Sequence, residues 1–174
     1  MSRRQPDLTI NGLRLPLRIG AQIQQSYEDI GGFALLRLGA GAAVPQQAWR
    51  KLRTTLSAQG IAPPGLAAID WTQPVTLGCI AARSIQSANN IINIPAARRA
   101  DAPPYGWAVM PDGTLRPTPV ALAGNVATLT PVAGAAGYQA LWYPLLTVYA
   151  MAGVQTSYDA VGAVAGWELA CEET

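Results

Sequence analysis

The chain has 174 residues, enough for one domain with an ordinary hydrophobic core. Asp, Glu, Lys and Arg make up only 13% of it while hydrophobic residues make up 50%, so the composition excludes an intrinsically disordered chain. There is no histidine, which excludes the catalytic triads and the metal sites that depend on an imidazole.

The shortage of charge has two interpretations. Charged residues are depleted where subunits meet, so the composition favours burial against other copies of the chain. Drift in a GC-rich genome is the alternative, because Ala and Arg are abundant and Lys51 is the only lysine. Charge is also uneven, with eleven Arg and Lys against four acids in residues 1–99 (+7) and one Arg against six acids in residues 100–174 (−5). Opposed charge on one chain suits a subunit that meets copies of itself.

The predicted elements are short strands, and the first two form a hairpin over Asp7 to Ile19. Leu8 and Ile10 alternate with polar residues, and Asn11-Gly12 is a strong signal for a tight hairpin turn. Pro16 has no N–H to donate, so we expect the return strand at the edge of a sheet or beside a bulge. The basic start of the chain leads into this alternating segment, so we expect no signal peptide and synthesis in the cytoplasm.

Further strands are predicted along the rest of the chain, which has 17 glycines and 14 prolines spread throughout. They are Ala21 to Tyr27, Phe33 to Leu38, Val75 to Ala81, Tyr105 to Met110, Leu115 to Leu122, Asn125 to Pro131, Tyr138 to Ala150 and Ala163 to Cys171. Residues 46–56 fit a helix with Trp49, Leu52 and Leu56 on one face, or a strand, which the Thr54-Thr55 pair favours. Residues 87–104 lack clear periodicity and predict a long exposed loop that orders on assembly. The sequence therefore predicts a mostly-β chain with little helix, a single-domain β-sandwich or barrel over residues 1–174.

The sequence contains no arrangement of residues that points to catalysis. The acidic pairs Glu28-Asp29 and Glu172-Glu173 consist of adjacent residues, which point to opposite faces of a strand and make no natural acid–base dyad. Lys51 lies among arginines, which indicates exposure and argues against a Schiff-base lysine with a depressed pKa. We predict no enzyme, no cofactor and no metal site. Cys79 and Cys171 lie in apolar surroundings and are expected to be buried, reduced thiols.

Two groups of residues are candidates for binding. Arg50, Lys51 and Arg53 form a basic cluster beside Trp49, which could follow a phosphate backbone, although a solvated face or a strip between subunits is favoured. Aromatic residues gather late in the chain, where core packing explains most of them. A carbohydrate-binding platform is the sharper alternative, and its candidate residues are Trp107, Trp142 and Tyr143. No apolar run approaches the length of a membrane span, so no membrane insertion is expected.

Three stretches of the chain resemble one class of protein in sequence. The opening stretch runs from the Asp7–Ile19 hairpin into Gln24–Gly32, the middle one is Trp49–Ser57 followed by Pro63–Leu66, and the last combines Trp142–Val148 with Trp167–Glu173. Through these segments the chain resembles small tail proteins of long-tailed bacteriophages. None of the segments is a catalytic signature.

The resemblance implies a distal tail (tail-tip) ring protein or the related tail-tube subunit. In those families a β-sandwich or barrel monomer closes into a hexameric ring around a lumen. The implied partners are copies of the chain and other tail proteins (tube, hub, tape measure or fibres), with DNA only in transit through the lumen. The implied location is the virion tail, after assembly in the host cytoplasm. A full distal tail protein often carries a second domain, for which this length leaves little room, so tail tip or baseplate, tube and terminator all stay open.

The resemblance also suggests where the binding candidates lie. Arg50, Lys51 and Arg53 are predicted to line the lumen or to contact the next ring, and Trp49, Arg98 and Arg99 are further interface candidates. Two alternatives from other classes stay open. One is a receptor- or glycan-binding tail accessory that uses the late aromatic residues, and the other is a carboxylate-based hydrolase of cell-wall sugars.

Overall fold

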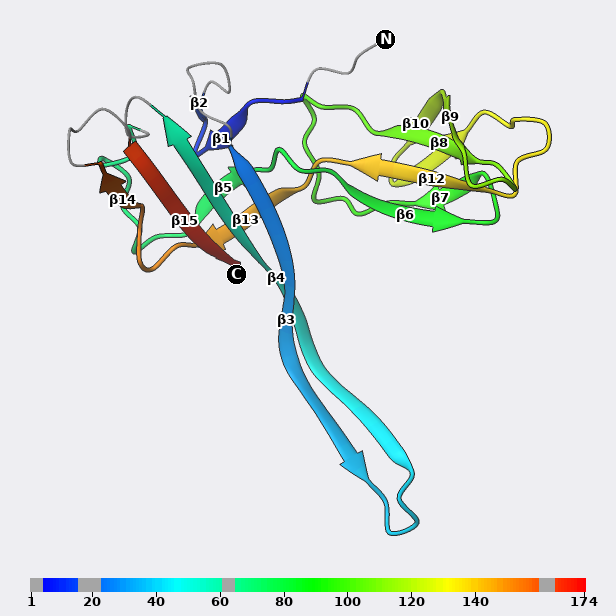
Figure 1. The fold of residues 1–174 in the computed structure, drawn as a ribbon, viewed down its shortest axis with the longest axis horizontal. Coiled ribbons are helices and arrows are strands. Elements are labelled where there is room, and N and C mark those ends of the chain that lie inside the picture. Colours follow the sequence, from blue (N-terminus) through cyan, green and yellow to red (C-terminus); the bar gives the residue numbers. More distant parts are fainter. Residues whose placement is uncertain (1–4, 16–22, 61–64, 160–164) are drawn as a thin grey trace. The chain divides into compact units, whose positions relative to one another are not determined.

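The computed structural model describes residues 5–15, 23–60, 65–159 and 165–174, and every regular element in these ranges is a β-strand (Figure 1). The prediction of a mostly-β chain is confirmed. The strands are β1 Leu8–Ile10, β2 Leu13–Leu15, β3 Gln24–Arg37, β4 Ala43–Gly60, β5 Val75–Gly78, β6 Arg83–Ser87, β7 Ile91–Asn93, β8 Tyr105–Val109, β9 Leu115–Thr118, β10 Val120–Ala123, β11 Val126–Leu129, β12 Gly137–Trp142, β13 Leu145–Tyr149, β14 Gln155–Tyr158 and β15 Ala165–Glu173.

The chain divides into two compact units. The first, called the sandwich unit here, comprises Met1–Arg14 and Leu77–Leu146, and the second, called the arm unit, comprises Leu15–Thr76 and Thr147–Thr174. Each unit is therefore built from two separate stretches of sequence. The single domain expected over residues 1–174 stays a prediction beside this division.

While β1 and β2 belong to a third sheet in which β1 pairs with β5, most of the sandwich unit consists of two antiparallel sheets, with strand orders β10-β11-β7 and β6-β12-β8-β9. Their buried side chains share one hydrophobic core, to which the first sheet contributes Ile92 and Leu129 and the second contributes Ala108, Ala140 and Trp142. The alternation of buried and half-buried residues along β8 and β12 is the pattern of strands with one face against a core. This unit has the sandwich-like arrangement that the sequence predicts.

Prolines divide two of the predicted strands. Pro119 separates β9 from β10, which belong to different sheets, so the expected strand Leu115 to Leu122 is in fact two strands. Pro144 separates β12 from β13 within the expected strand Tyr138 to Ala150 in the same way. Proline cannot donate to a ladder and fixes its own φ, so the chain changes sheet at these points.

The beginning of the sandwich unit confirms the predicted hairpin turn. Asn11 and Gly12 have φ angles of 47° and 79°, as a type I′ turn between β1 and β2 requires. The rest of the expected return strand, from Pro16 to Ile19, lies outside the described residues. The expected loop over residues 87–104 differs from the prediction, because it contains β7 and buries Ile92 and Ile94.

In the arm unit, β15 is the central strand. It pairs with β4 along one edge, and with β14 and then β13 along the other, while β3 pairs with the free edge of β4. Leu56 of β4 and Leu169 of β15 are cross-strand partners and both are buried. Residues 46–56 lie within β4, so the choice of strand over helix is confirmed.

Candidate interaction surface

The hairpin of β3 and β4 extends well beyond the sheet to which it belongs. β15 covers β4 only from Gly60 to Arg53, whereas the pairing of β3 with β4 continues to Arg37 and Ala43 (Figure 1). Among the described residues, no third strand pairs with residues 31–49, which we call the arm. Every residue from Phe33 to Arg50 is exposed. The arm is therefore a two-stranded ribbon with two open edges and two open faces.

The arm carries large apolar side chains on both faces. Cross-strand partners lie on the same face of a ribbon, so Phe33 and Leu35 (opposite Pro45) share one face, while Leu36 and Val44 share the other. Six apolar residues of the hairpin are between 37% and 60% exposed: Phe33, Leu35, Leu36, Leu38, Val44 and Trp49. Arg37, near the tip, is the only charged residue between 31 and 49. A surface of this kind is typical of a binding site for another protein.

A β-bulge lies at the root of the arm. The register shifts between Gly31 and Phe33, where two steps along β3 oppose three along β4. A side chain at Gly31 would meet the backbone oxygen of Trp49 and the ring of Phe33, and one at Gly32 would approach the Trp49 indole nitrogen to 3.0 Å. The two glycines thus admit the close approach of Trp49 that the bulge requires.

The basic cluster predicted from the sequence also lies at this root, and its charges are paired within the chain. Arg50 contacts Asp29 at 2.5 Å, and Arg53 bridges Glu172 at 2.5 Å and Glu28 at 3.4 Å. The hydrogen bond from each arginine to its carboxylate, Asp29 for Arg50 and Glu172 for Arg53, is the main reason why the pKa of each guanidinium is raised.

Two further polar contacts join the same region to the end of β15. The Lys51 ammonium donates to the backbone oxygen of Thr174 at 2.5 Å, and the Leu52 N–H donates to Glu173 at 3.1 Å. Together with the ion pairs, these contacts fasten β4 to β15 and β3 where the arm begins. Because acidic side chains pair with the two arginines, the cluster stabilises the junction of the three strands. This pairing argues against the hypothesis that the cluster binds a phosphate backbone.

The other two arginines predicted at an interface, Arg98 and Arg99, form hydrogen bonds within the sandwich unit. Arg99 is only 3% exposed, is paired with Asp101 at 2.6 Å, and donates to the carbonyl oxygens of Asp7, Gly78 and Cys79. A side chain buried with this many acceptors cannot reach a partner, so the expectation for Arg99 is wrong. Arg98 is half-buried and donates to the Gly124 carbonyl and the Asn125 side chain, as well as to Pro95.

The predicted carbohydrate platform is not assembled. Trp142 is 4% exposed and Tyr143 is 9% exposed, so neither ring can stack on a sugar, and this expectation is corrected for both. Trp142 belongs to the core between the two sheets, where its large apolar surface is needed. Trp107 is half-buried and meets Tyr105 edge to face, with 6.5 Å between ring centroids.

A polar groove lies in the arm unit, at the end of β3 that is opposite the tip of the arm. It holds about 720 Å³ and is lined by residues of β3, β4, β14 and β15. Gln24, Ser57, Glu168 and Gln155 form one continuous cross-strand row through it. Among the described residues of its lining, Glu168 is the only charged one, and the others are mostly amides and hydroxyls.

Two other expectations concern the cysteines and the membrane. Cys79 and Cys171 are both buried, as the sequence predicts. Within the part of the chain that the structure describes, no helix has the length and apolar character needed to cross a bilayer.

The apolar residues of the arm and the polar groove were missed as candidate sites from the sequence. Phe33 and Leu35 are typical of a core strand in sequence, and only the structure shows that they are exposed, without a cover from the described residues. Glu168 is one of several isolated acids, and its position in the groove depends on the pairing of β14 with β15. Comparison with protein-family models, with curated proteins and with solved structures finds no match to this chain.

Proposed function

We propose that this chain is a non-enzymatic structural subunit that assembles with copies of itself through the arm. The observation that carries the proposal is the exposure of apolar side chains on both faces of a ribbon that no third strand accompanies in the described part of the chain. An isolated two-stranded hairpin is marginally stable in water, and open edges invite pairing with other chains. A neighbouring subunit that covers the arm would remove both difficulties.

The size of the apolar surface favours a closed assembly over an isolated pair. Burying six half-exposed large side chains contributes roughly 1 kcal/mol each, about 6 kcal/mol for one arm. Association itself costs about 4 to 15 kcal/mol in lost freedom of motion, so a single arm contact gives a weak pair. In a closed ring every subunit gives one arm and receives another. Ring closure therefore adds one arm contact without the free-energy cost of immobilising a further subunit.

The assembly that we propose is a ring of a bacteriophage tail, most specifically a tail-tip or baseplate ring of six subunits. This finer part is supported by the sequence resemblance described above and by the low charge and opposed charge balance of the chain. A tail-tube or tail-terminator subunit is the alternative within the same class. Such a ring would stack on the tail tube and support hub or fibre proteins, with DNA in transit through its lumen and no insertion into a membrane.

Light scattering after size-exclusion chromatography tests the proposal. We expect the wild-type chain to form an oligomer, and negative-stain microscopy to show rings with an open centre. Leu35→Glu, which places a charge on an apolar face of the arm, should shift the protein to monomers. Leu115→Glu is the matched control, because Leu115 is similarly exposed but lies on β9 of the sandwich unit.

The outcomes separate the coarse proposal from the finer one. A wild-type chain that stays monomeric up to high concentration would overturn self-assembly through the arm. An oligomer that Leu35→Glu leaves intact would overturn the role of the arm. An arm-dependent oligomer without rotational symmetry about an open centre would retain self-assembly and remove the tail ring.

A further inference from the structure

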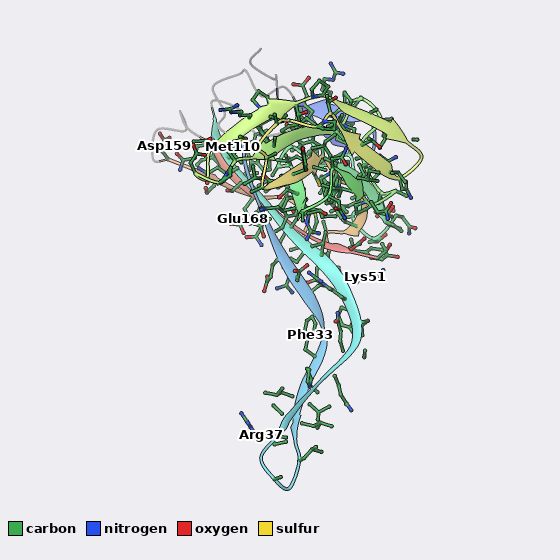
Figure 2. All side chains as sticks on the ribbon, turned by 90° about the vertical axis from the view of Figure 1, so that its right-hand side faces the viewer. Phe33, Arg37, Lys51, Met110, Asp159 and Glu168 are labelled. Atoms are coloured by element: carbon green, nitrogen blue, oxygen red, sulfur yellow. The ribbon has the colours of Figure 1, made fainter. Side chains whose placement is uncertain are left out.

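We propose that the tip of the arm docks into the polar groove of a second copy, where Arg37 pairs with Glu168. This inference rests on the proposed self-assembly and names the two surfaces that meet. Figure 2 shows Arg37 at the tip of the arm and Glu168 beyond the opposite end of the ribbon, with Phe33 between them. Among the described residues neither Arg37 nor Glu168 forms an ion pair.

The tip of the arm presents a small turn with exposed backbone, the apolar side chain of Leu38 and one positive charge. Its turn, Gly39-Ala40-Gly41, has almost no side chain and is exposed, so the backbone of Gly39 and Ala40 can approach a partner closely. The turn is held by hydrogen bonds from Gly41 N–H to the Leu38 carbonyl and from Leu38 N–H to the Ala42 carbonyl. Arg37 is exposed and donates to the Gly41 carbonyl at 3.3 Å, which keeps the guanidinium beside the turn.

The groove has the complementary chemistry. Amide and hydroxyl side chains, those of Gln24, Ser57 and Gln155 among them, can donate to and accept from exposed backbone groups. Gly166 forms part of the lining, where a side chain would approach the Ser157 hydroxyl to 2.8 Å, so the lining is kept low at this point. Glu168, the one carboxylate among the lining residues that the structure describes, matches the single guanidinium of the arm.

The two surfaces cannot meet within one chain. Gln24 of the groove and Arg37 of the tip are the two ends of β3 itself. At about 3.3 Å per residue, thirteen steps of an extended strand separate them by roughly 43 Å. A contact between different surfaces of identical copies is head to tail, and such contacts build closed rings or open filaments. The apolar shaft of the arm then lies along the neighbouring copy while the tip fixes its register.

Charge reversal in the full-length chain tests the pairing. We expect Arg37→Glu and Glu168→Arg each to weaken assembly by about tenfold or more, since one close charge pair at an interface is worth at least about 1.4 kcal/mol. The double variant should regain assembly to within about threefold of the wild type, as measured by sedimentation over a concentration series. Arg116→Glu is the control, an exposed arginine of β9 that should leave assembly unchanged.

A mixing experiment tests whether the contact is between copies. Arg37→Glu chains retain a native groove, and Glu168→Arg chains retain a native tip, so an equal mixture offers every tip an oppositely charged groove. We expect the mixture to assemble at concentrations where each variant alone is monomeric. Single variants that assemble like the wild type, or a mixture and a double variant no better than the single variants, would overturn the docking. If the wild type assembles in that case, the arm seats elsewhere on the partner, while a monomeric wild type defeats both proposals.

Discussion

The two halves of strand β4 differ in burial. From Leu52 to Ala58 its alternate side chains are buried, where β15 and β3 flank it and Leu169 and Cys171 of β15 are buried as well. From Ala43 to Arg50 every residue is exposed, although the pairing with β3 continues without interruption as far as the bulge. The difference lies in the neighbours, since the hydrophobic content of the two halves is similar. Burial in a sheet depends on a third strand and a covering layer, and the described residues provide neither of these for the arm.

Truncation of one leucine in each half should give the largest difference between the two regions in the free energy of unfolding. Leu56→Ala removes a buried side chain and should lower the free energy of unfolding by about 2 to 5 kcal/mol. Leu35→Ala removes an exposed one and should change it by no more than about 0.5 kcal/mol in the monomer. Urea unfolding at low protein concentration measures both. Equal losses would show that the arm packs against its own chain, contrary to the comparison.

The bulge that divides the halves should be the next most sensitive feature. Gly31→Ala places a methyl group against the Trp49 backbone oxygen and within 2.8 Å of the Phe33 ring, so the root must shift. We expect a loss of about 1 to 3 kcal/mol, the usual cost of overpacking. Gly39→Ala is the matched control, because its added methyl group meets open space and its φ is not positive. Equal shifts of the unfolding midpoint for the two variants would contradict the claim that the bulge requires glycine at position 31.

The smallest expected effect concerns a charge that is held by the sandwich unit. The hydrogen bond from Arg99 lowers the pKa of Asp101 below its ordinary value, against a smaller opposing effect of burial. A carboxyl whose pKa is lower in the folded than in the unfolded chain stabilises the fold above about pH 4 and loses this contribution as the pH falls through its folded pKa. Asp101→Asn should therefore reduce stability at pH 7 and make its acid dependence shallower, with a modest size because the carboxylate is half exposed. An unchanged difference from wild type between pH 7 and pH 2 would contradict this sign.

Local signals in the sequence predicted the features that depend on neighbouring residues. Asn11-Gly12 specifies its turn because both residues tolerate positive φ, and the Thr54-Thr55 pair favours the strand that β4 forms. The breaks at Pro119 and Pro144 were foreseeable from the missing N–H, although the alternation around them continues. β14 was missed, since Gln155 to Tyr158 has no apolar alternation, although it pairs with β15 along its whole length.

The candidate sites were harder to predict, because exposure depends on contacts between distant segments. Trp142 and Trp49 are equally plausible as core residues or as binding residues in sequence, yet one is buried between two sheets and the other lies at the root of the arm. The charges of Arg50 and Arg53 resemble an exposed basic strip until the acids of β3 and β15 are placed beside them. No spacing in the sequence indicates these partners.

Hydrogen–deuterium exchange of the arm amides tests the central claim most directly. The backbone of residues 33–49 should exchange rapidly in the monomer, and the outward-facing amides should become protected by an order of magnitude or more when the concentration is raised into the assembled range. Amides of the sandwich core, around Ala108 and Ala140, should be equally protected under both conditions. Arm amides that exchange at the same rate in monomer and oligomer would contradict the claim that a second copy covers the arm.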